Sequence, residues 1–408
     1  MANLLAHAAR QVPHYREVWE RRPTGDVGTL EAWPVLSKET LRTRPRTFLK
    51  DGSDPAQMSR EQTSGTTGKP VVVWWSRRTA REWYALFEAR VRMWNGVNRH
   101  DRWGMLGGQL VVPVRRTRPP FWVWNQSLNQ LYLSSYHLAP QNVGDYLDAM
   151  RRYKVTYLFG YASSLYSVAQ LAAELRLDAP PMRVAISNAE PLLGHQRAKI
   201  AEVFGCPVRD TYGMSEVVCG GSECSEGKMH LWPEVGVVEI LRDDVDEPAA
   251  PGEPGRIVAT GLLNREMPLI RYQTGDRGAL EPEAMPCRCG RGLPVLRSIE
   301  GRFDDVIVTP DGRRVGRLDT VFKGAFAIRE AQIVQDDLEH VRVQVVPAEG
   351  FGERDAIGVA EALQDRLGTD VKIRVECVES IPRTKAGKFR AVLSMVSDAA
   401  KDPERRSR

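Results

Sequence analysis

Hydrophobic and polar positions follow two kinds of repeat along the chain. Up to about residue 301, short apolar runs such as 155–159 alternate with segments of helical periodicity such as 143–153. This alternation is typical of a parallel sheet with crossover helices. The predicted strands are 71–75, 155–159, 184–186 and 207–211, and the predicted helices are 3–20, 79–94, 143–153, 164–175 and 195–204. A further helix is expected to begin near Glu39, with Ser37 as its N-cap.

The pattern becomes antiparallel toward the C-terminus. Residues 235–241 and 255–260 read as antiparallel strands, and strand-like segments at 331–335, 340–346 and 371–378 surround an amphipathic helix at 355–367. We therefore expect an α/β protein. A large N-terminal domain, 1–301, would hold parallel and mixed sheets, and a small α+β C-terminal domain would span 302–400. Residues 401–408 are expected to be a disordered, solvated tail.

Composition places the chain among ordinary soluble globular proteins. Its 408 residues are 42% hydrophobic and 27% charged, and no apolar run reaches the roughly 18 residues of a membrane span. The N-terminus lacks the basic and apolar regions of a signal peptide, so we expect a cytoplasmic protein without a membrane partner. The net charge of +5 is spread along the chain, which suits an anionic small molecule better than nucleic acid.

The most informative segment is TSGTTGKP at 63–70, a Ser/Thr/Gly loop with one lysine. Its glycines let backbone N–H groups approach an anion, its hydroxyls add donors, and Lys69 adds a positive charge. The spacing excludes a GxxxxGK[ST] loop, because Gly65 and Gly68 are too close and Pro70 stands where a magnesium-binding hydroxyl would be. By itself the segment is also compatible with a flexible linker.

Two polar segments follow predicted strands, where open parallel sheets bind ligands. SNAEPL begins at Ser187, and DTYGMSE runs from Asp210 to Glu216. Tyr212 offers a flat surface for a base, Gly213 permits close approach, and Glu216 is a candidate magnesium ligand. A strand followed by a turn with a capping serine would give the same pattern.

Three later segments add charged groups in expected turns. YQTGD places Asp276 after a tight turn, where its carboxylate can accept both hydroxyls of a ribose, and GRFDD at 301–305 adds a guanidinium and paired carboxylates. PRTKAGK at 382–388 carries Lys388 in a loop that can reach a site in another domain. Each segment is also compatible with an ordinary turn or an exposed loop, so none is specific alone.

Taken together and in this order, TSGTTGKP, YGMSE, YQTGD, GRFDD and PRTKAGK resemble the adenylate-forming superfamily of acyl-CoA synthetases. Within it the chain is most similar to the phenylacetate–CoA ligase-like family and its CapK-like branch. SSYHL at 134–138, GYASSLY at 160–166 and PLIRYQTGD at 268–276 support this placement. The resemblance covers nearly the whole chain, and it implies a ligase that activates a carboxylate with Mg-ATP and releases pyrophosphate.

The resemblance also implies roles for individual residues. Lys388 would be the catalytic lysine that bridges the attacking carboxylate and the α-phosphate, although an exposed basic loop would look the same. Glu216 would hold Mg²⁺, and Asp304 would be the hinge of a mobile C-terminal domain. The expected ATP- and AMP-binding residues are Thr63, Ser64, Gly65, Thr66, Thr67, Gly68, Lys69, Asn188, Ala189, Glu190, Asp210, Thr211, Tyr212, Gly213, Ser215, Asp276 and Arg302.

The acyl pocket is expected between three segments of the N-terminal domain. Its residues would be Tyr136, His137, Tyr161, Ser163, Gly213 and Met214. The tyrosines and the glycine suggest a flat slot compatible with an aromatic acid. His137 could orient the acid, or it could simply be hydrogen-bonded at a helix start.

Cysteine spacing points to a metal site. A potential Cys₃His set, which tetrahedral zinc favours, is formed by Cys224, His230, Cys287 and Cys289. The phenylacetate–CoA ligase-like family often carries such a pattern, and four protein ligands would make the zinc structural. Reduced, packed cysteines are the alternative. Cys219 could substitute as a ligand, whereas Cys206 is expected in the core.

The chain departs from the family after GRFDD, where Val308 stands at a position that usually carries lysine. That lysine helps to shape the thioester-forming arrangement, so the departure concerns transfer to CoA more than adenylation. Arg313, Arg314 and Arg317 could still contact CoA phosphates or form an exposed basic loop.

We expect an aryl or small acyl acid as substrate and CoA as acceptor. The alternative acceptor is an amine, another nitrogen nucleophile or a carrier protein in a biosynthetic pathway. A non-catalytic nucleotide-binding scaffold is a third hypothesis. A homodimer is a reasonable expectation for such an enzyme.

Overall fold

The computed structural model describes most of the chain. The described residues are 1–21, 26–62, 71–109, 111–113, 115–282, 286–302, 307–310, 314–315, 318–323, 327–383 and 389–396. The expected phosphate loop, 63–69, lies outside these ranges, as do Lys388, Asp304, Arg313, Arg317 and the tail 401–408.

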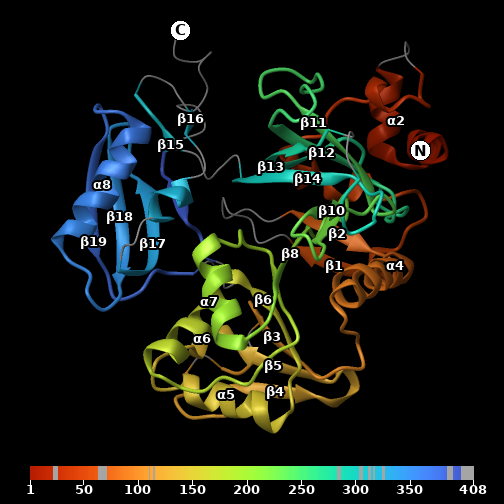
Figure 1. Ribbon diagram of the computed structural model, residues 1–408. Coiled ribbons are helices and arrows are strands. Elements are labelled where there is room, and N and C mark those ends of the chain that lie inside the picture. Colours follow the sequence, from red (N-terminus) through yellow and green to blue (C-terminus); the bar gives the residue numbers. More distant parts are fainter. Residues whose placement is uncertain are drawn as a thin grey trace.

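A mixed sheet organises the larger part of the molecule (Figure 1). Its parallel strands are β3 (Trp103–Gly107), β5 (Gln130–Ser134), β6 (Tyr157–Tyr161), β7 (Ala185–Asn188) and β8 (Val208–Gly213), with β4 (Trp122–Asn125) antiparallel at the edge. The helices α5 (Val143–Arg152), α6 (Ala162–Glu174) and α7 (Gly194–Phe204) are the crossovers, and they pack with these strands in one buried core. The expected parallel sheet with crossover helices is therefore confirmed.

The same sheet continues into an antiparallel half. Its strands are β9 (Gly220–Glu223), β10 (Met229–Leu231), β11 (Gly236–Leu241), β12 (Gly255–Gly261), β13 (Tyr272–Leu280) and β14 (Val295–Arg302). The full order of the twelve strands is β11-β12-β13-β14-β10-β9-β8-β7-β6-β3-β5-β4. The change from parallel to antiparallel pairing falls between β7 and β9, at β8.

The N-terminal segment folds differently from the expected single helix at 3–20. It forms two helices, α1 (Ala2–Gln11) and α2 (Pro13–Glu20), separated by an extended Val12 with φ −111°. Pro13 is the physical reason, because proline has no backbone N–H to continue a helix but is well suited to the first position of a new one.

Four further elements follow the N-terminal helices in the sequence. Helix α3 (Lys38–Thr43) begins as expected, since the Thr40 N–H donates to Ser37 Oγ at 3.2 Å. The strands β1 (Ser59–Gln62) and β2 (Val72–Trp75) pair antiparallel, and they flank the segment 63–70 in the sequence. Helix α4 (Arg77–Phe87) continues through a π-helical turn and ends before Gly96, whose φ is +70°.

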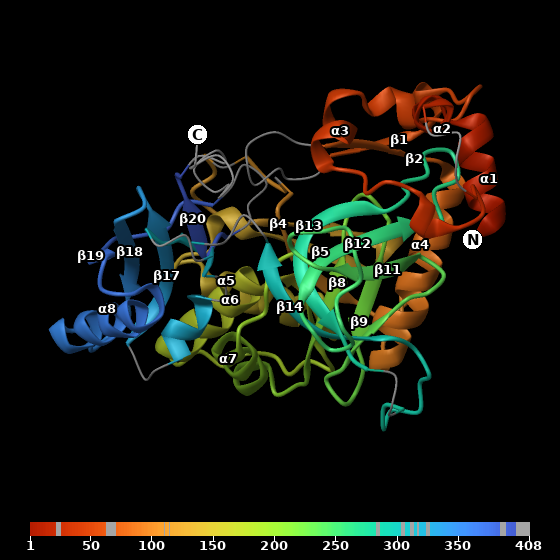
Figure 2. The same ribbon diagram turned by 90° about the horizontal axis from the view of Figure 1, so that it is seen from above.

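A separate four-stranded sheet forms the C-terminal part. Its strands are β17 (Ile328–Gln335), β18 (His340–Pro347), β19 (Lys372–Cys377) and β20 (Val392–Ser394), in the order β19-β18-β17-β20. Helix α8 (Glu353–Leu367) packs on this sheet through Val359, Leu363 and Leu367, and the short strands β15 (Ile307–Val308) and β16 (Arg314–Val315) precede it. Both views place this part on the opposite side of the molecule from α1 and α2 (Figures 1 and 2).

The expected α/β class, with a large mixed-sheet part and a small α+β part, is confirmed. None of the described helices combines the length and the apolar character needed to cross a membrane.

Candidate active site

The antiparallel half of the sheet brings Asp276 to the end of β8. The Tyr212 hydroxyl, on β8, donates to Asp276 Oδ2, on β13, at 2.8 Å. These strands are separated by β9, β10 and β14 in the sheet order. Since neighbouring strands lie about 4.8 Å apart, a flat sheet would separate β8 from β13 by about 19 Å. The contact therefore requires a strongly curled sheet, which closes over the ends of the parallel strands.

The YQTGD segment is not the simple tight turn that the sequence suggested. Residues 272–276 lie inside β13, and the ladder with β12 shifts register around Gly275, whose φ is +86°. Glycine adopts this conformation without the steric cost that other residues meet. Asp276 is the Cα partner of Arg302 on β14, so the backbone places these two expected nucleotide-binding residues side by side.

Glu216 lies in a buried polar cluster behind Asp276. Its side chain is 3% exposed, and its Oε1 accepts a hydrogen bond from the Tyr272 hydroxyl at 2.7 Å. The Lys38 ammonium lies 3.8 Å from the same oxygen and donates to the Thr274 carbonyl at 3.3 Å. The buried carboxylate is thus held by one hydroxyl and one cation.

Sequence reasoning missed Lys38. The residue occupies the first position of α3, where the helix dipole disfavours a cation, and that unusual charge was the available signal. Its placement depends on a long-range contact, because Leu36 pairs with Tyr272 and exchanges backbone hydrogen bonds with the two residues that flank it. Lys38 thereby reaches the middle of β13 from a helix more than two hundred residues away in the sequence.

Three non-glycine residues with left-handed backbones adjoin this site. They are Ala189 (φ 62°), Val217 (φ 53°) and Arg271 (φ 47°), and each is the immediate neighbour of a site residue: Glu190, Glu216 and Tyr272. Positive φ is costly for a residue with a Cβ, most of all for a β-branched one such as Val217. Such strain persists only where surrounding packing fixes the backbone, so the site is rigidly held.

The Glu190 carboxylate bonds to backbone N–H groups of the protein, whereas the sequence suggested a contact with the nucleotide. Its Oε2 accepts the Ser163 N–H at 2.9 Å, and its Oε1 accepts the Phe389 N–H at 2.6 Å. Both oxygens therefore bond to backbone donors in the described structure, and the expected contact of Glu190 with adenine stays a prediction. Asn188, two residues earlier, has a buried Oδ1 without a partner among the described residues, so it remains open to a ligand amino group.

Asp210 is held beneath the end of β7 by a dense set of polar groups. Its Oδ1 accepts from Ser187 Oγ at 2.5 Å and from the Thr211 N–H at 2.9 Å. Burial, reinforced by the nearby Glu223 carboxylate, raises the pKa of Asp210 to about 7. Glu223 itself accepts two hydrogen bonds from the Arg197 guanidinium, at 2.9 and 2.8 Å, and one from the Asp210 N–H.

Two of the six residues expected in the acyl pocket, Tyr136 and Tyr161, lie beside Gly108. The Tyr136 hydroxyl donates to the Gly108 carbonyl at 2.9 Å. Tyr161 contacts the same residue, and burial, with the neighbouring Glu190 carboxylate, raises the pKa of its hydroxyl to about 12. Tyr132, which the sequence did not single out, lies close enough to Gly107 that a Cβ there would stand 3.0 Å from its hydroxyl. Three tyrosines thus surround one glycine pair.

His137 has the environment of a structural histidine. Its side chain is buried, its Nδ1 bonds to Ser134 Oγ at 2.7 Å, and its ring stacks on Phe121 with centroids 4.9 Å apart. Ser163 contributes its backbone N–H to Glu190. These contacts favour the interpretation of His137 as a packing residue.

Tryptophans support the segment from Gly213 to Ser215. The Trp75 indole donates to the Ser215 carbonyl at 2.8 Å, and a Cβ at Gly213 would meet Trp83 at 3.2 Å. Met214 packs with the core of the N-terminal part. A side chain at position 213 would therefore displace Trp83 or the strand end that carries Tyr212.

The four expected metal ligands come together in the fold. The ligand atoms of Cys224, His230, Cys287 and Cys289 all lie within 4.8 Å of one another. The sulfurs of Cys224 and Cys287 are 3.8 Å apart, and Cys289 Sγ is 3.3 Å from His230 Nε2. Zn–S bonds of about 2.3 Å in tetrahedral geometry place two sulfurs about 3.8 Å apart, so the donor set fits zinc. The other ring nitrogen of His230 lies 3.3 Å from the Leu293 carbonyl, an arrangement that commonly orients zinc-bound histidines.

Two other cysteines lie elsewhere. Cys219, considered above as a substitute ligand, is not part of the metal-ligand cluster. Its thiol is buried beside Tyr212, and burial together with the nearby Asp276 and Glu216 carboxylates raises its pKa strongly. Cys206 packs in the core of the parallel half, as expected.

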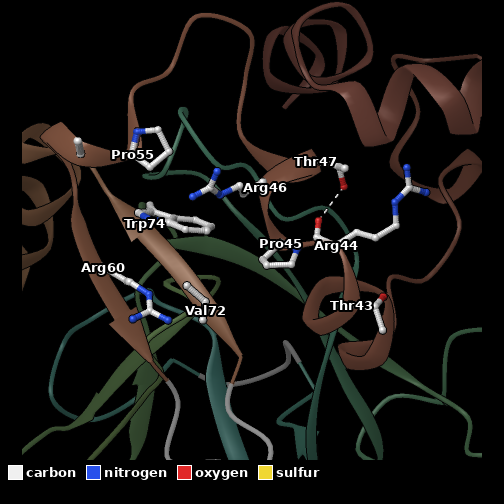
Figure 3. Close-up of a pocket in the computed structure, with 10 residues that line it drawn as sticks. Thr43, Arg44, Pro45, Arg46, Thr47, Pro55, Arg60, Val72 and Trp74 are labelled. Atoms are coloured by element: carbon white, nitrogen blue, oxygen red, sulfur yellow. Dashed lines mark hydrogen bonds between the residues drawn. The ribbon is translucent and has the colours of Figure 1, made fainter.

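A cavity of about 770 Å³ lies away from these groups, between α3 and the β1–β2 hairpin (Figure 3). It is lined by Thr43, Arg44, Pro45, Arg46, Thr47, Pro55, Ala56, Arg60, Val72 and Trp74. In Figure 3 the Arg46 guanidinium points toward Pro55 and Trp74, whereas Arg44 points away and pairs with Glu17 at 3.2 Å. The lining of this cavity contains none of the site residues described above.

The chain is similar to known proteins over most of its length. The AMP-binding enzyme family model matches residues 61–264, half of the chain, and the CapK C-terminal domain model matches residues 307–395. The chain is 26% identical to protein CapK of Staphylococcus aureus over 91% of its own length and 81% of the relative. It is also 26% identical to a phenylacetate–coenzyme A ligase of Thermus thermophilus, over 97% of this chain and 95% of the relative.

Among solved structures, 2-hydroxyisobutyryl-CoA ligase shares the fold. Its postadenylation state, in complex with R3-HIB-AMP, aligns with a TM-score of 0.73 at 22% identity, covering 100% of this chain and 89% of that one. The thioesterification state of the same enzyme aligns with a TM-score of 0.58, covering 98% and 88%. Both states share the fold of this chain, and the postadenylation state aligns with the higher score.

The chain belongs to the AMP-binding enzyme family. Within it, the chain is a phenylacetate–CoA ligase-like, CapK-like protein, and it is an adenylate-forming ligase.

The raised pKa of Asp210 predicts a pH dependence of stability. An unfolded aspartate has a pKa of about 3.9, so between about pH 4 and pH 7 the folded state binds more protons than the unfolded state. The free energy of unfolding should therefore fall as pH rises through this window, by at most about 1.4 kcal/mol per pH unit from this group. Asp210→Asn should remove the slope.

Urea unfolding at pH 5 and pH 8 measures this effect. The mutant should gain stability relative to the wild type at pH 8 and gain least at pH 5. Asp148→Asn, which changes an exposed carboxylate paired with Arg151, is the control and should show no such trend. Parallel pH profiles for wild type and Asp210→Asn would contradict the assignment.

Lys38 and Lys50 form a matched pair for testing the buried contact. Each ammonium lies 3.8 Å from a glutamate, but Glu216 is 3% exposed and Glu266 is 21% exposed. Lys38→Ala leaves a buried carboxylate without its cation and should cost about 1–2 kcal/mol of unfolding free energy, less than for a fully buried pair because Lys38 itself is partly exposed. Lys50→Ala should cost less than about 0.5 kcal/mol by the same measurement. Equal losses would show that Lys38 has no special role at Glu216.

Proposed function

We propose that this protein activates a carboxylic acid with ATP, forms an acyl-adenylate with release of pyrophosphate, and then transfers the acyl group to CoA. The observation that carries the proposal is the bond between Glu190 and Phe389. It brings Phe389, which follows Lys388, to the end of β7. This strand lies beside β8, where the Tyr212 hydroxyl donates to Asp276 on β13. A lysine there could bridge the acid and the α-phosphate, two anions that otherwise repel one another.

The remaining polar groups suit the nucleotide. The Asp276 carboxylate, oriented by Tyr212, would accept the ribose hydroxyls, and Arg302 on the neighbouring strand would assist. The open Asn188 Oδ1 would accept the amino group of adenine. Residues 63–69 would bind the outer phosphates, and the three tyrosines around Gly108 would form one wall of a pocket for an aryl or small acyl group.

Magnesium fits the Glu216 cluster in part. A single carboxylate completed by phosphate oxygens is a usual environment for this ion, and it would neutralise the phosphates as pyrophosphate leaves. Tyr272 fixes the orientation of the Glu216 carboxylate, and Lys38 provides the cation that balances its charge in the described structure. Glu216 would therefore exchange one positive partner for another when Mg-ATP binds.

Two domains would carry out the reaction. We assign residues 1–301 to ATP and acid binding and 302–400 to a mobile domain that delivers Lys388, with Asp304 as the hinge between them. Rotation of the mobile domain between the two half-reactions would allow one site to serve both of them.

The environment of Val308 bears on the identity of the acyl acceptor. Val308, at the position where the family usually carries lysine, is 2% exposed, and its backbone exchanges two hydrogen bonds with the Gln335 side chain, at 3.1 and 2.7 Å. This buried apolar position cannot supply a cation to a CoA complex. The observation favours a second candidate, in which the adenylate passes to an amine, another nitrogen nucleophile or a carrier protein.

We further propose that the Cys₃His cluster holds a structural Zn²⁺. All four positions of a tetrahedral ion would be filled by protein, which leaves none for substrate. The ligands come from β9–β10 and from the segment before β14, so the ion would fasten these strands at the turn of the sheet.

Cys287→Ser tests the metal site. It should lower the zinc content, measured by elemental analysis, from about one ion per chain to well below one, and lower the thermal midpoint in parallel, because the binding free energy of a structural ion contributes to folding. Cys206→Ser changes a core cysteine outside the cluster and should leave the zinc content unchanged. A wild-type protein that binds no zinc would return the cysteines to the packed-core interpretation.

Pyrophosphate release from Mg-ATP tests the enzyme. We expect release with one class within a panel of aryl and alkyl carboxylic acids, and a rate lower by at least about a hundredfold in Lys388→Ala, since that change removes the cation from the transition state. Adding CoA, or a set of amines, shows which acceptor raises turnover.

Each outcome of that assay has a clear meaning. A rise with CoA supports the thioester product, and a rise only with an amine supports the second candidate. Normal adenylation by Lys388→Ala would overturn the role of this lysine. Absence of release with every acid, in a folded protein, would favour the non-catalytic scaffold.

A further inference from the structure

The Glu190 carboxylate connects three segments that are distant in the sequence. It follows β7, is 9% exposed, and accepts backbone hydrogen bonds from residues 27 and 199 positions away. The first donor, Ser163, belongs to the first turn of α6, which has no side-chain cap of its own. Glu190 therefore caps this helix from outside, and its charge is favourable at the helix N-terminus.

The second donor belongs to the C-terminal part. Phe389 directly follows Lys388 in the sequence, so the bond to Glu190 fixes the chain at the residue next to the expected catalytic lysine. Both oxygens of Glu190 act as acceptors, an arrangement that favours the ionised carboxylate, since its oxygens only accept hydrogen bonds.

Arg383 supports the ionised form of Glu190 and the shape of the same segment. Its guanidinium lies over the Phe389 ring, 4.7 Å from the centroid, and it pairs with Glu330 on β17. Burial raises the pKa of Glu190, and the positive charge of Arg383 is the smallest of the effects that oppose it. The residues on either side of 384–388 are thus tied together and to β17.

A second contact holds the other end of α6. Arg329, on β17, donates to both oxygens of Glu174 at 2.9 and 2.6 Å, and Glu174 is the last residue of the helix. Helix α6 is therefore bound to the C-terminal part directly at its last residue, and through Glu190 at its N-terminus. A rotation of the C-terminal part would have to break both contacts.

We propose that Glu190 is a positioning residue, a releasable latch that holds Phe389, the residue directly after Lys388, near the N-terminus of α6 for adenylation and frees it for the second half-reaction. The inference rests on the proposed function. The global comparison agrees with it, because the postadenylation state of 2-hydroxyisobutyryl-CoA ligase aligns better with this arrangement than its thioesterification state. Glu190 would then act through the lysine and would not touch the nucleotide.

Glu190→Gln tests the latch. The amide keeps the size of the side chain but offers one acceptor oxygen, and its NH₂ group would face one of the two N–H donors. Amide hydrogen exchange, followed by mass spectrometry, should become at least about tenfold faster in the peptide that contains Phe389, as expected for loss of a hydrogen bond to a charged group. Glu202→Gln, which alters a surface carboxylate paired with Lys199, is the matched control and should leave this peptide unchanged.

A kinetic readout on the same proteins separates positioning from general damage. In ATP–pyrophosphate exchange with the acid found active above, Glu190→Gln should lower kcat by about tenfold or more while KM for ATP changes less than about threefold. Arg383→Gln leaves Glu190 intact. It should also speed amide hydrogen exchange in the Phe389 peptide and lower kcat, each by a smaller factor than Glu190→Gln. Unchanged amide hydrogen exchange in the β17–β18 peptides shows that the variant keeps its fold.

The outcomes distinguish this inference from the proposed function. Unchanged exchange at the Phe389 peptide in Glu190→Gln overturns the latch, even if the wild type forms adenylates normally. Faster exchange with an unchanged kcat overturns the link to Lys388. If the wild type adenylates no acid, the proposed function fails, and the exchange experiment alone still decides whether Glu190 holds the segment.

Discussion

The curl of the twelve-stranded sheet is the constraint on which the rest of the site depends. Backbone hydrogen bonds connect the parallel strands through β8 to the antiparallel half, by way of the short strands β9 and β10. Because of this curl, the hydroxyl of Tyr212 reaches Asp276 across three intervening strands. The four potential metal ligands lie in the same region, on β9–β10 and just before β14. A metal bound there would stabilise the geometry that the nucleotide site needs.

Buried carboxylates are the second common feature, and each is compensated in its own way. Glu223 is bound by a guanidinium, Glu216 by a hydroxyl and an ammonium, and Glu190 by two backbone N–H groups. A carboxylate taken out of water without such partners would be strongly destabilising. Two of these groups are compensated only in part, because burial raises the pKa of Glu190, and burial with the charge of Glu223 raises the pKa of Asp210 to about 7. The compensation makes these groups rigid, and the left-handed residues beside Glu190, Glu216 and Tyr272 show how firmly the backbone is held.

Helix α6 links this rigid site to the C-terminal part. Its N-terminus is capped by a residue that also binds the segment after Lys388, and its last residue carries a forked ion pair to β17. The same helix follows Tyr161, which lines the expected acyl pocket. An acid bound near Tyr161 and a lysine held by Glu190 would therefore share one structural element, so that binding of substrate and placement of the lysine can be coupled.

The sequence by itself determined the fold class, the order of the crossover elements and the kinds of side chain present at the candidate site. Those features follow from local periodicity and from short motifs, whose residues act on their neighbours in the chain. It did not reveal β3, β4 and β5, which mix glycine, tryptophan and polar residues and so lack a clear apolar run. It missed the break at Pro13, the role of Lys38 and the true partners of Glu190. The tertiary structure decided these partners, because contacts such as Lys38 with Glu216 and Glu190 with Phe389 join residues 178 and 199 positions apart, and no local pattern encodes which buried charge will meet which donor.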